Sequence, residues 1–266
     1  MNGLIRDFHL ALRTLLRSPG FLIVAVTSLG LSIGANTAIF SFVNGVFFKP
    51  LPCAEPDRLV AVMEMPAASS VGANSPQNFL DWQRQNTVFE SIAAYYNYAS
   101  VSLGGVAEAV QIPGARVSAR YFDILRLRTV LGRTFAEDED QPGKDHVVIL
   151  SHNLWSTDFG ADPKIVGTSI RLNDEPYTVI GVLPKDSPLE RGRPRLWRPL
   201  SFAPSEMTRN VHSLGTVARL KPSVSLEQAR QEMDLIGKRI AADFPVSNKG
   251  WEVRVYPLSR TLLTRG

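Results

Sequence analysis

An uncharged stretch near the start of the chain, Phe21 to Phe48, constrains the fold more than any other feature. The charged residues nearest to it are Arg17 and Lys49. A helix needs about 20 apolar residues to cross the ~30 Å hydrocarbon core of a bilayer. At ~1.5 Å per residue, a stretch of roughly 28 residues spans that thickness with some tilt. The sequence therefore predicts a transmembrane helix over residues 21–48.

A secretory signal peptide is the competing interpretation of this stretch. The apolar region of a signal peptide is usually ~7–15 residues long and ends at a small-x-small cleavage site. The observed stretch is about twice that length, and it ends in Phe47-Phe48 followed by Lys49-Pro50. An uncleaved anchor is therefore favoured, with cleavage left as the alternative.

The first twenty residues are predominantly basic, which predicts the orientation of the anchor. Their basic residues are Arg6, Arg13 and Arg17, and Asp7 is their acidic residue. Short basic flanks stay in the cytoplasm, and Lys49 alone opposes them. We therefore expect a single-pass protein of the inner (plasma) membrane, with its N-terminus cytoplasmic and residues 49–266 in the periplasm.

Residues 1–20 are predicted to form a cytoplasmic juxtamembrane helix. Leucine, isoleucine and phenylalanine residues lie on one face at helical spacing, and the arginines lie on the other. Such a helix suits the surface of an anionic leaflet. Packing on a soluble partner is the alternative. The functional residues assigned to the basic face are Arg6, Arg13 and Arg17.

A stripe of small and polar residues runs along the predicted spanning helix. Its members, spaced three or four residues apart, are Thr27, Gly30, Gly34, Thr37, Ser41 and Asn44. Small residues let helices approach closely in a membrane, and polar ones hydrogen-bond across the interface. The stripe predicts contact with helices from a second copy or permease half, from another protein, or from sequence outside this chain.

The remainder of the chain alternates strand and helix patterns, which predicts an α+β domain of mixed sheets with helices in two lobes. Strands are predicted over Leu59–Met65, Phe89–Val101, Ala109–Val117, His146–Leu150, Thr168–Leu172, Tyr177–Leu183, His212–Leu220 and Trp251–Tyr256. Helices are predicted over Ser75–Gln85, Ser118–Leu125, Ser151–Phe159 and Ser225–Phe244. Asn173-Asp174-Glu175 is a turn-forming set between two of these strands, which predicts a hairpin.

The charge of the chain is concentrated at its start. The whole chain carries +4, of which residues 1–50 contribute +3. No nucleic-acid-binding surface is therefore implied. Cys53 is the only cysteine, so no disulfide forms within the chain.

Signatures of catalysis are absent from the sequence. It contains no phosphate-binding G-x-x-x-x-G-K-[ST], no G-x-S-x-G and no H-E-x-x-H. The histidines, which show no ligand spacing, are His9, His146, His152 and His212. We therefore expect no enzymatic activity, no cofactor and no metal site.

Two charged segments and the tryptophans admit more than one interpretation. The acidic run Glu137–Asp140 is read first as a solvated loop or helix start, with a weak cation site or a contact with a basic partner as the alternative. The segment 191–198 is also read as a solvated loop, with contact to lipid headgroups or a partner as the alternative. Its arginines are Arg191, Arg193, Arg195 and Arg198. Trp82, Trp155, Trp197 and Trp251 are read as core residues or lobe contacts.

A succession of segments resembles MacB-type ABC transporter permeases, and most closely the acidobacterial duplicated (orphan) permease branch. Around the anchor these are LRSPGF, GANTAIFSFVNGVFFKPLP and DRLV. The later ones are FLDWQRQNTVFESIAAY, ARVSARYFDILRLRTVLGRTFAEDED, VVILSHNLWSTDFGADPKIVGTSIRLNDEPYTVIGVLP and VARLKPSVSLEQARQEMDLIGKRIAADFP. The resemblance covers nearly the whole chain, and none of the segments is catalytic.

The resemblance implies a domain order and a function. Residues 51–258 would form a MacB-like periplasmic core domain, and residues 259–266 would begin the linker to an FtsX-like permease domain, so the chain would be a truncated or partial permease. A separate cytoplasmic ABC ATPase would drive lobe motion through the helices, for export or extraction of an unknown substrate. A second permease half or copy, and an adaptor in the periplasm, are the further partners implied. The alternative is a membrane-anchored binding, sensor or scaffold module that acts without ATP.

Overall fold

The computed structural model describes residues 19–43, 53–69, 72–104, 110–191 and 194–258. The chain divides into two compact units, Met1–Pro50 and Leu51–Gly266, which are described separately.

The first unit contains the helix α2 (Pro19–Val43). It begins at Pro19, the first-turn position that the sequence predicts for proline. The predicted end of the spanning helix, Phe48, lies outside the described residues. Judged by length, hydropathy and charge together, no helix among the described residues qualifies as a membrane span.

The described strands of the second unit form one mixed sheet. They are β1 (Leu59–Pro66), β2 (Phe89–Gly104), β3 (Val110–Val117), β4 (Leu131–Gly132), β5 (Val147–Leu150), β6 (Ser169–Leu172), β7 (Glu175–Val182), β8 (Leu196–Pro199), β9 (Gly215–Leu220) and β10 (Trp251–Pro257). The strand order is β10-β1-β9-β2-β3-β8-β5-β7-β4, and β6 pairs with β2 and β7. Two of the pairings, β3 with β8 and β5 with β7, are parallel, and the others between these strands are antiparallel.

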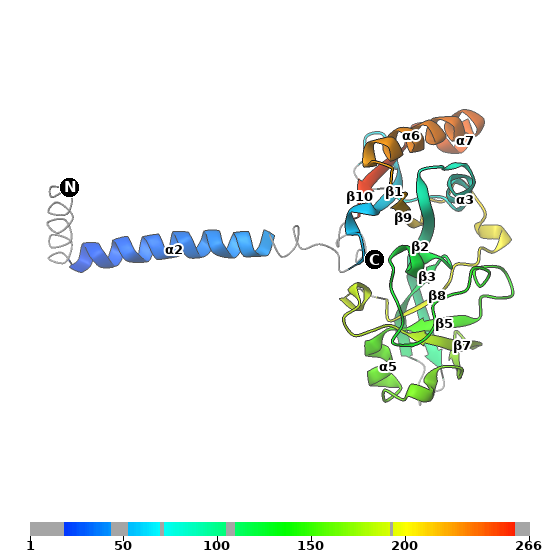
Figure 1. Cartoon of the computed structure of the whole chain (residues 1–266), viewed down its shortest axis with the longest axis horizontal. Helices are drawn as coiled ribbons and strands as arrows, with labels where there is room; N and C mark the ends of the chain where they lie inside the picture. The colour runs from blue at the N-terminus through cyan, green and yellow to red at the C-terminus, as the bar shows by residue number, and fades with distance from the viewer. Residues whose placement is uncertain (1–18, 44–52, 70–71, 105–109, 192–193, 259–266) are drawn as a thin grey trace. The chain divides into compact units, whose positions relative to one another are not determined.

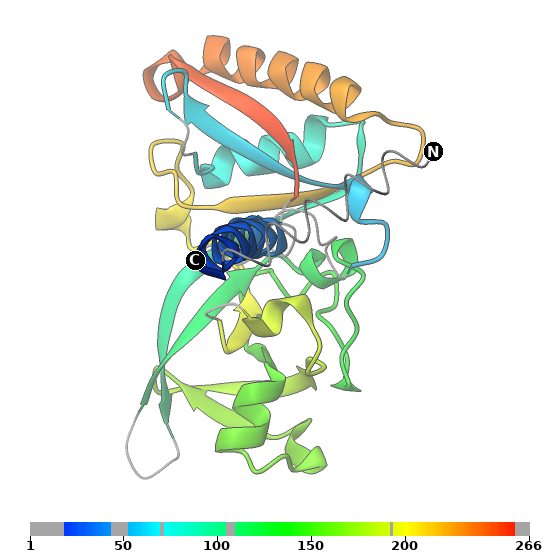
Figure 2. The ribbon, with the colours of Figure 1, turned by 90° about the vertical axis from the view of Figure 1, so that its left-hand side faces the viewer.

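Most helices of this unit lie at the two ends of the sheet (Figure 1), and one short helix packs against β2 and β9 between them. They are α3 (Pro76–Gln85), α4 (Tyr121–Ile124), α5 (His152–Asp158), α6 (Leu226–Asp243) and α7 (Pro245–Asn248). The short 3-10 helices are η2 (Pro56–Arg58), η3 (Pro163–Ile165), η4 (Pro188–Arg191) and η5 (Pro204–Glu206). The helix α6 packs along β10 (Figure 2), and α5 lies at the opposite end, near β5 and β7.

The predicted helix starts at Ser75, Ser151 and Ser225 are confirmed, because these side chains cap the helices. The helix predicted from Ser118 begins later, at Tyr121, without a side-chain cap. The Ser75 hydroxyl accepts a hydrogen bond from Asn78 N, and the Ser151 hydroxyl accepts one from Leu154 N at 2.9 Å. Ser225 forms a capping box with Gln228 at the start of α6. The predicted apolar face of α6 is buried at Ala229, Met233, Ile236 and Ile240.

The predicted hairpin of β6 and β7 is also confirmed, and its turn has a local cause. Asn173 has φ 50° and Asp174 has φ 66°, both in the left-handed region. Two consecutive residues with positive φ produce the twist that matches two antiparallel strands, and Asn and Asp tolerate this conformation best after glycine.

The α+β class is confirmed, and the strands predicted to form mixed sheets belong to a single mixed sheet. Two apolar clusters form its ends, one around Trp82 and Met233 and the other around Leu154 and Val179. A third cluster, around Phe122, lies between them. The long strand β2 pairs with β9, β3 and β6, and this continuity joins the two halves.

The prediction of a solvated loop over residues 191–198 is wrong for its described second half. Residues Leu196–Pro199 form β8, which pairs with β3 and β5. Trp197 is only 1% exposed. The strand escapes prediction because its two buried apolar residues stand between arginines and prolines, which are typical of loops.

Two arginines of this segment contact other parts of the protein, and the side chains of the other two lie outside the described residues. Arg195 pairs with Asp158 at 3.0 Å. The Arg198 guanidinium lies 5.3 Å from the centre of the Tyr177 ring and donates to its hydroxyl. The side chain of Arg191 and the whole of Arg193 lie outside the description, so a partner contact there stays a prediction.

Candidate functional site

The first and last described strands of the second unit lie side by side. Strands β1 and β10 are antiparallel, with Val60 opposite Pro257. Leu258 N donates to Leu59 O at 2.9 Å. The beginning of β1 therefore meets the end of β10 at one place in the sheet. Residues 53–58, which lead into β1, are called the junction segment below.

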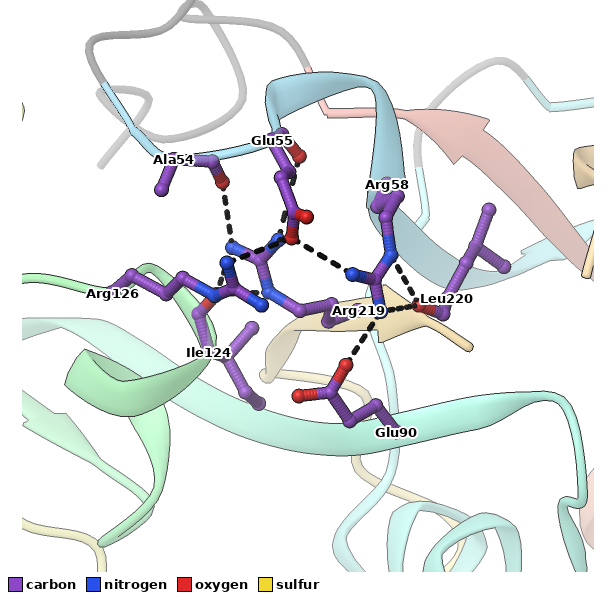
Figure 3. A network of polar contacts seen from close by, with 8 residues as sticks. All are labelled: Ala54, Glu55, Arg58, Glu90, Ile124, Arg126, Arg219 and Leu220. Atoms are coloured by element: carbon purple, nitrogen blue, oxygen red, sulfur yellow. Dashed lines mark hydrogen bonds and ion pairs between the residues drawn. The ribbon is translucent and has the colours of Figure 1, made fainter. Parts of the chain in front are cut away.

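A buried arginine holds the junction segment to the middle of the sheet (Figure 3). Arg219 lies in β9 and is 1% exposed. Its Nε and Nη2 donate to Ile124 O at 2.9 and 2.7 Å, and Nη2 also donates to Ala54 O at 3.0 Å. Burial, together with the charges of Arg126 and Arg58, lowers the pKa of Arg219. One side chain thus connects β9, the end of α4 and the junction segment.

Glu55 is the centre of the charged part of this network. Its Oε2 lies 2.8 Å from Arg58 Nη1, 2.8 Å from Arg126 Nη1 and 3.4 Å from Arg219 Nη1. The Glu55 backbone has φ 51°, a left-handed conformation that is uncommon for this residue type. This conformation persists because the surrounding contacts determine it.

Arg58 extends the network to β2 and to the end of β9. Its Nη2 contacts Glu90 at 2.5 Å, and its Nε and Nη2 donate to Leu220 O at 2.9 and 2.7 Å. The arrangement offers no nucleophile or acid–base pair. Its physical effect is to fasten the junction segment to three parts of the domain, α4, β2 and β9 (Figure 3).

Sequence reasoning does not identify this network. The available signal is a charged residue within the strand pattern Gly215–Leu220, where Arg219 is surrounded by apolar neighbours. Such an arginine must find buried acceptors if the strand is central. Nothing in the sequence indicates that those acceptors are backbone carbonyls of residues 54 and 124.

Replacing Glu55 with glutamine should lower the free energy of unfolding by about 1 kcal/mol, because it removes the charge shared by three guanidinium groups. The Glu55 side chain is 46% exposed, so high salt should reduce the difference. Urea unfolding at low and high salt measures the effect. Glu227→Gln, at an exposed pair with Arg230, is the control and should be near neutral. Equal effects of both substitutions would contradict this account of Glu55.

The predicted helix-packing stripe is described only in part. Thr27, Gly30, Gly34 and Thr37 lie in α2 and are exposed, and a Cβ at either glycine would meet nothing within 4 Å. The Thr27 hydroxyl donates within the helix, to Ile23 O at 2.5 Å and Val24 O at 3.1 Å. Outside the description are the side chain of Ser41 and the whole of Asn44, Arg6, Arg13 and Arg17. Helix packing and membrane-surface contact stay predictions.

The acidic run is occupied by local contacts. Glu137 pairs with Arg120, Asp138 with Lys144 and Glu139 with Arg133, and Asp140 accepts from Ala119 N. The bond from Lys144 lowers the pKa of Asp138. Within the described ranges, no group of three or more histidine, cysteine or acidic residues could hold a metal ion.

The comparison with known families decides the relationship. The description of the matching family is "MacB-like periplasmic core domain", and the match covers residues 22–236. The chain belongs to this family. The predicted relationship to MacB-type permeases is thereby confirmed.

Individual relatives agree with this family. MacB, the macrolide export ATP-binding/permease protein of Hahella chejuensis, is 25% identical over 230 residues, which cover 83% of this chain and 33% of the relative. MacB of Neisseria meningitidis is 29% identical over 137 residues, which cover 50% of this chain and 21% of the relative. The chain thus spans only a fifth to a third of these relatives.

Solved structures support the MacB-like fold. A permease-protein domain from Porphyromonas gingivalis has a TM-score of 0.60 at 16% identity, covering 78% of this chain and 92% of that domain. The periplasmic region of MacB from Actinobacillus actinomycetemcomitans has a TM-score of 0.56 at 15% identity, covering 75% and 88% respectively. At these identities the likeness concerns the fold alone.

Proposed function

We propose that this chain is the membrane-anchored, periplasmic part of a MacB-like ABC transporter permease. The uncharged stretch from Phe21 to Phe48 would anchor it, with the N-terminus in the cytoplasm. The domain that follows would move in response to ATP hydrolysis by a separate cytoplasmic ATPase. The motion would serve export or extraction of a substrate, as the name of the macrolide exporter MacB suggests for its own substrate class.

The observation that carries this proposal is the junction. A domain placed between two membrane segments needs its beginning and its end close together, and Leu59 and Leu258 are hydrogen-bonded neighbours. A domain moved by its anchor also needs a firm connection to it. The bonds of Arg219 and Arg126 to the junction segment, and those of Arg58 within it to Glu90 and Leu220, would make that connection resist displacement.

The mechanism requires two states of different free energy. Motion of a rigid domain about its anchor can do work only if ATP binding or hydrolysis changes the relative stability of its positions. The stripe that includes Gly30 and Gly34 would pack against helices of the second permease half or copy. An adaptor in the periplasm would be a further partner of the domain. The alternative of an ATP-independent sensor or scaffold needs the same anchor but no ATPase.

Labelling from outside the cell tests the proposed topology. In a Cys53→Ser background, Lys144→Cys places a thiol at a side chain that is 55% exposed, and Arg13→Cys places one in the basic N-terminal segment. A membrane-impermeant maleimide added to spheroplasts should label the first variant, and the second only after permeabilisation. Labelling of Arg13→Cys without permeabilisation, or recovery of the chain without detergent, would refute the anchor.

Copurification separates the transporter from the sensor alternative. The gene in its native context is expressed with its neighbours, and the protein is captured from solubilised membranes. An ATPase subunit should be retained, or an ATPase domain should be found on the same polypeptide. If the cellular function of this protein persists in cells whose ATPase site has been inactivated, the sensor alternative is favoured.

A further inference from the structure

A cavity of about 310 Å³ lies beside β2 and β3 in the second unit. Its lining includes Tyr96, Arg116, Leu200 and Phe202. Residues 207–214, called the wall loop here, contribute Thr208, Val211, Ser213 and Leu214. The position of the wall loop therefore determines the shape of this cavity.

The wall loop is fastened to buried polar groups through two of its other residues. Arg209 pairs with Asp81 of α3 at 2.6 Å and donates to Asn78. The ring of His212 stacks on Trp251 of β10, with ring centres 3.7 Å apart and planes inclined by 4°. His212 Nε2 lies 3.4 Å from Glu64 Oε2 in β1. The last contact is the unusual one, because the Glu64 side chain is buried and the His212 side chain is only 10% exposed.

Glu64 is 2% exposed, and the positive charge that acts on it is shared with another carboxylate. Its carboxylate accepts hydrogen bonds from Ser75 N at 3.0 Å and from the Asn78 amide. Arg209, whose charge acts on Glu64, is itself paired with Asp81. Since an uncompensated buried charge is costly, the protein must either protonate Glu64 or protonate the histidine beside it.

The two ring nitrogens of His212 have different surroundings. Its ring is hydrogen-bonded to the backbone of Asn210, whereas Nε2 is buried with no hydrogen-bond partner. A neutral ring that donates through Nδ1 presents a lone pair at Nε2. Glu64 Oε2 lies 3.4 Å from this nitrogen, so a proton on the carboxyl group would supply the donor that Nε2 lacks.

We propose that Glu64 and His212 hold one proton between them, and that this shared proton keeps the wall loop anchored with constant strength at mildly acidic pH. The proton stays on the carboxyl group of Glu64, which donates a hydrogen bond to Nε2 of the neutral His212 ring. Burial raises the pKa of Glu64 from 4.5 to about 7, and burial lowers the pKa of His212 below 6.5. Both directions favour this arrangement.

The sign of the pH dependence follows from counting protons. With the loop anchored, the pair binds one proton up to about pH 7. With the loop released, Glu64 is ionised above 4.5 and His212 takes up a proton below 6.5, so between these two pH values the pair again binds one. Equal proton numbers mean that the anchoring free energy does not change with pH in this range. The other charged groups of this cluster, Arg209, Asp81 and Arg84, form a chain of ion pairs.

Single substitutions should break this balance in opposite directions. In Glu64→Gln, His212 resists protonation while the loop is anchored but takes up a proton when the loop is released. The protection of the wall loop from hydrogen exchange should therefore fall as the pH decreases below 6.5. In His212→Phe, which keeps an aromatic ring beside Trp251, the buried Glu64 alone titrates. Protection should then fall as the pH increases from 4.5 to about 7. Each slope should approach about tenfold per pH unit.

Hydrogen exchange of the full chain in detergent measures these slopes as protection factors of peptides covering residues 207–214. The wild type should show a flat profile between about pH 4.5 and 6.5, and strand β5 should show one in all variants. His146→Phe is the matched control, because His146 also stacks on an aromatic ring, Tyr177, but its side chain is 50% exposed. Identical pH profiles in the wild type, Glu64→Gln and His212→Phe would overturn the proposal.

A measurement on the wild type covers the case in which a variant fails to fold. Labelling the histidines with ¹⁵N gives four residues to observe in the full chain. His212 should show a proton on Nδ1, an accepting Nε2 and a neutral ring well below pH 6.5. A His212 ring that becomes charged at the ordinary histidine pKa would overturn the proposal.

Discussion

Replacing Arg219 with methionine should lower the free energy of unfolding of the second unit by about 3 kcal/mol. Methionine fills much of the same volume but cannot donate hydrogen bonds. The buried carbonyl of Ile124 would lose two donated bonds, at roughly 1–3 kcal/mol for a buried acceptor left unsatisfied, and the part-buried carbonyl of Ala54 would lose one. Relief of repulsion between Arg219 and its neighbours Arg58 and Arg126 offsets part of this loss.

Urea unfolding followed by tryptophan fluorescence measures this change in the full chain. Trp82, Trp155, Trp197 and Trp251 all lie in the second unit, so the signal reports on that unit alone. The control is Arg120→Met, which removes an exposed pair with Glu137 and should change stability by less than about 0.5 kcal/mol. A loss for Arg219→Met no larger than that of the control would show that the junction segment is not held as described.

The Arg219 substitution also has a consequence for the proposed function. If the junction segment transmits motion, loosening it should uncouple transport from ATP hydrolysis in the intact transporter. Transport should then fall more than ATPase activity. Parallel loss of both activities would indicate a general folding defect.

Replacing Trp197 with alanine should cost about 3–5 kcal/mol of stability, as is typical for truncating a large aromatic residue in a core. Trp197 is 1% exposed and meets Phe122 edge to face, with ring centres 6.0 Å apart. Its ring belongs to the central cluster that joins the two halves of the sheet. The cavity left behind would weaken both β8 and its neighbours β3 and β5.

This substitution discriminates between the strand and the solvated loop that the sequence suggests for the segment. Replacing a tryptophan in a solvated loop with alanine would lower the free energy of unfolding by less than about 0.5 kcal/mol. Trp197→Phe keeps most of the apolar contact and should cost clearly less than Trp197→Ala. Val246→Ala, at a residue 99% exposed, is the surface control. Similar unfolding midpoints for Trp197→Ala and Val246→Ala would contradict the buried position of the strand.

Local patterns in the sequence predict most elements of the second unit correctly. The serine caps of α3, α5 and α6 and the turn at Asn173 and Asp174 depend on contacts within a few residues. The apolar face of α6 follows from helical spacing alone. These signals are reliable because each depends on side chains that are close in sequence. Such side chains come into contact independently of how the remainder of the chain packs.

Elements that depend on distant partners escape prediction. The strand β8 is four residues long and lies in a segment rich in arginine and proline. It is stabilised by backbone pairing with β3 and β5, which are remote in sequence. Likewise, the contacts of Arg219 with residues 54 and 124 bridge separations that no local pattern encodes.

The sequence alone determined the uncharged stretch, the α+β class, the capped helices and the resemblance to MacB-type permeases. Composition and short-range spacing fix these properties, and they need no knowledge of packing. Only the tertiary structure decided that one continuous sheet joins both halves. It also brought Glu55 to three arginines and placed His212 against Glu64. Those features arise from the folded path of the backbone, which places residues far apart in the chain within hydrogen-bonding distance.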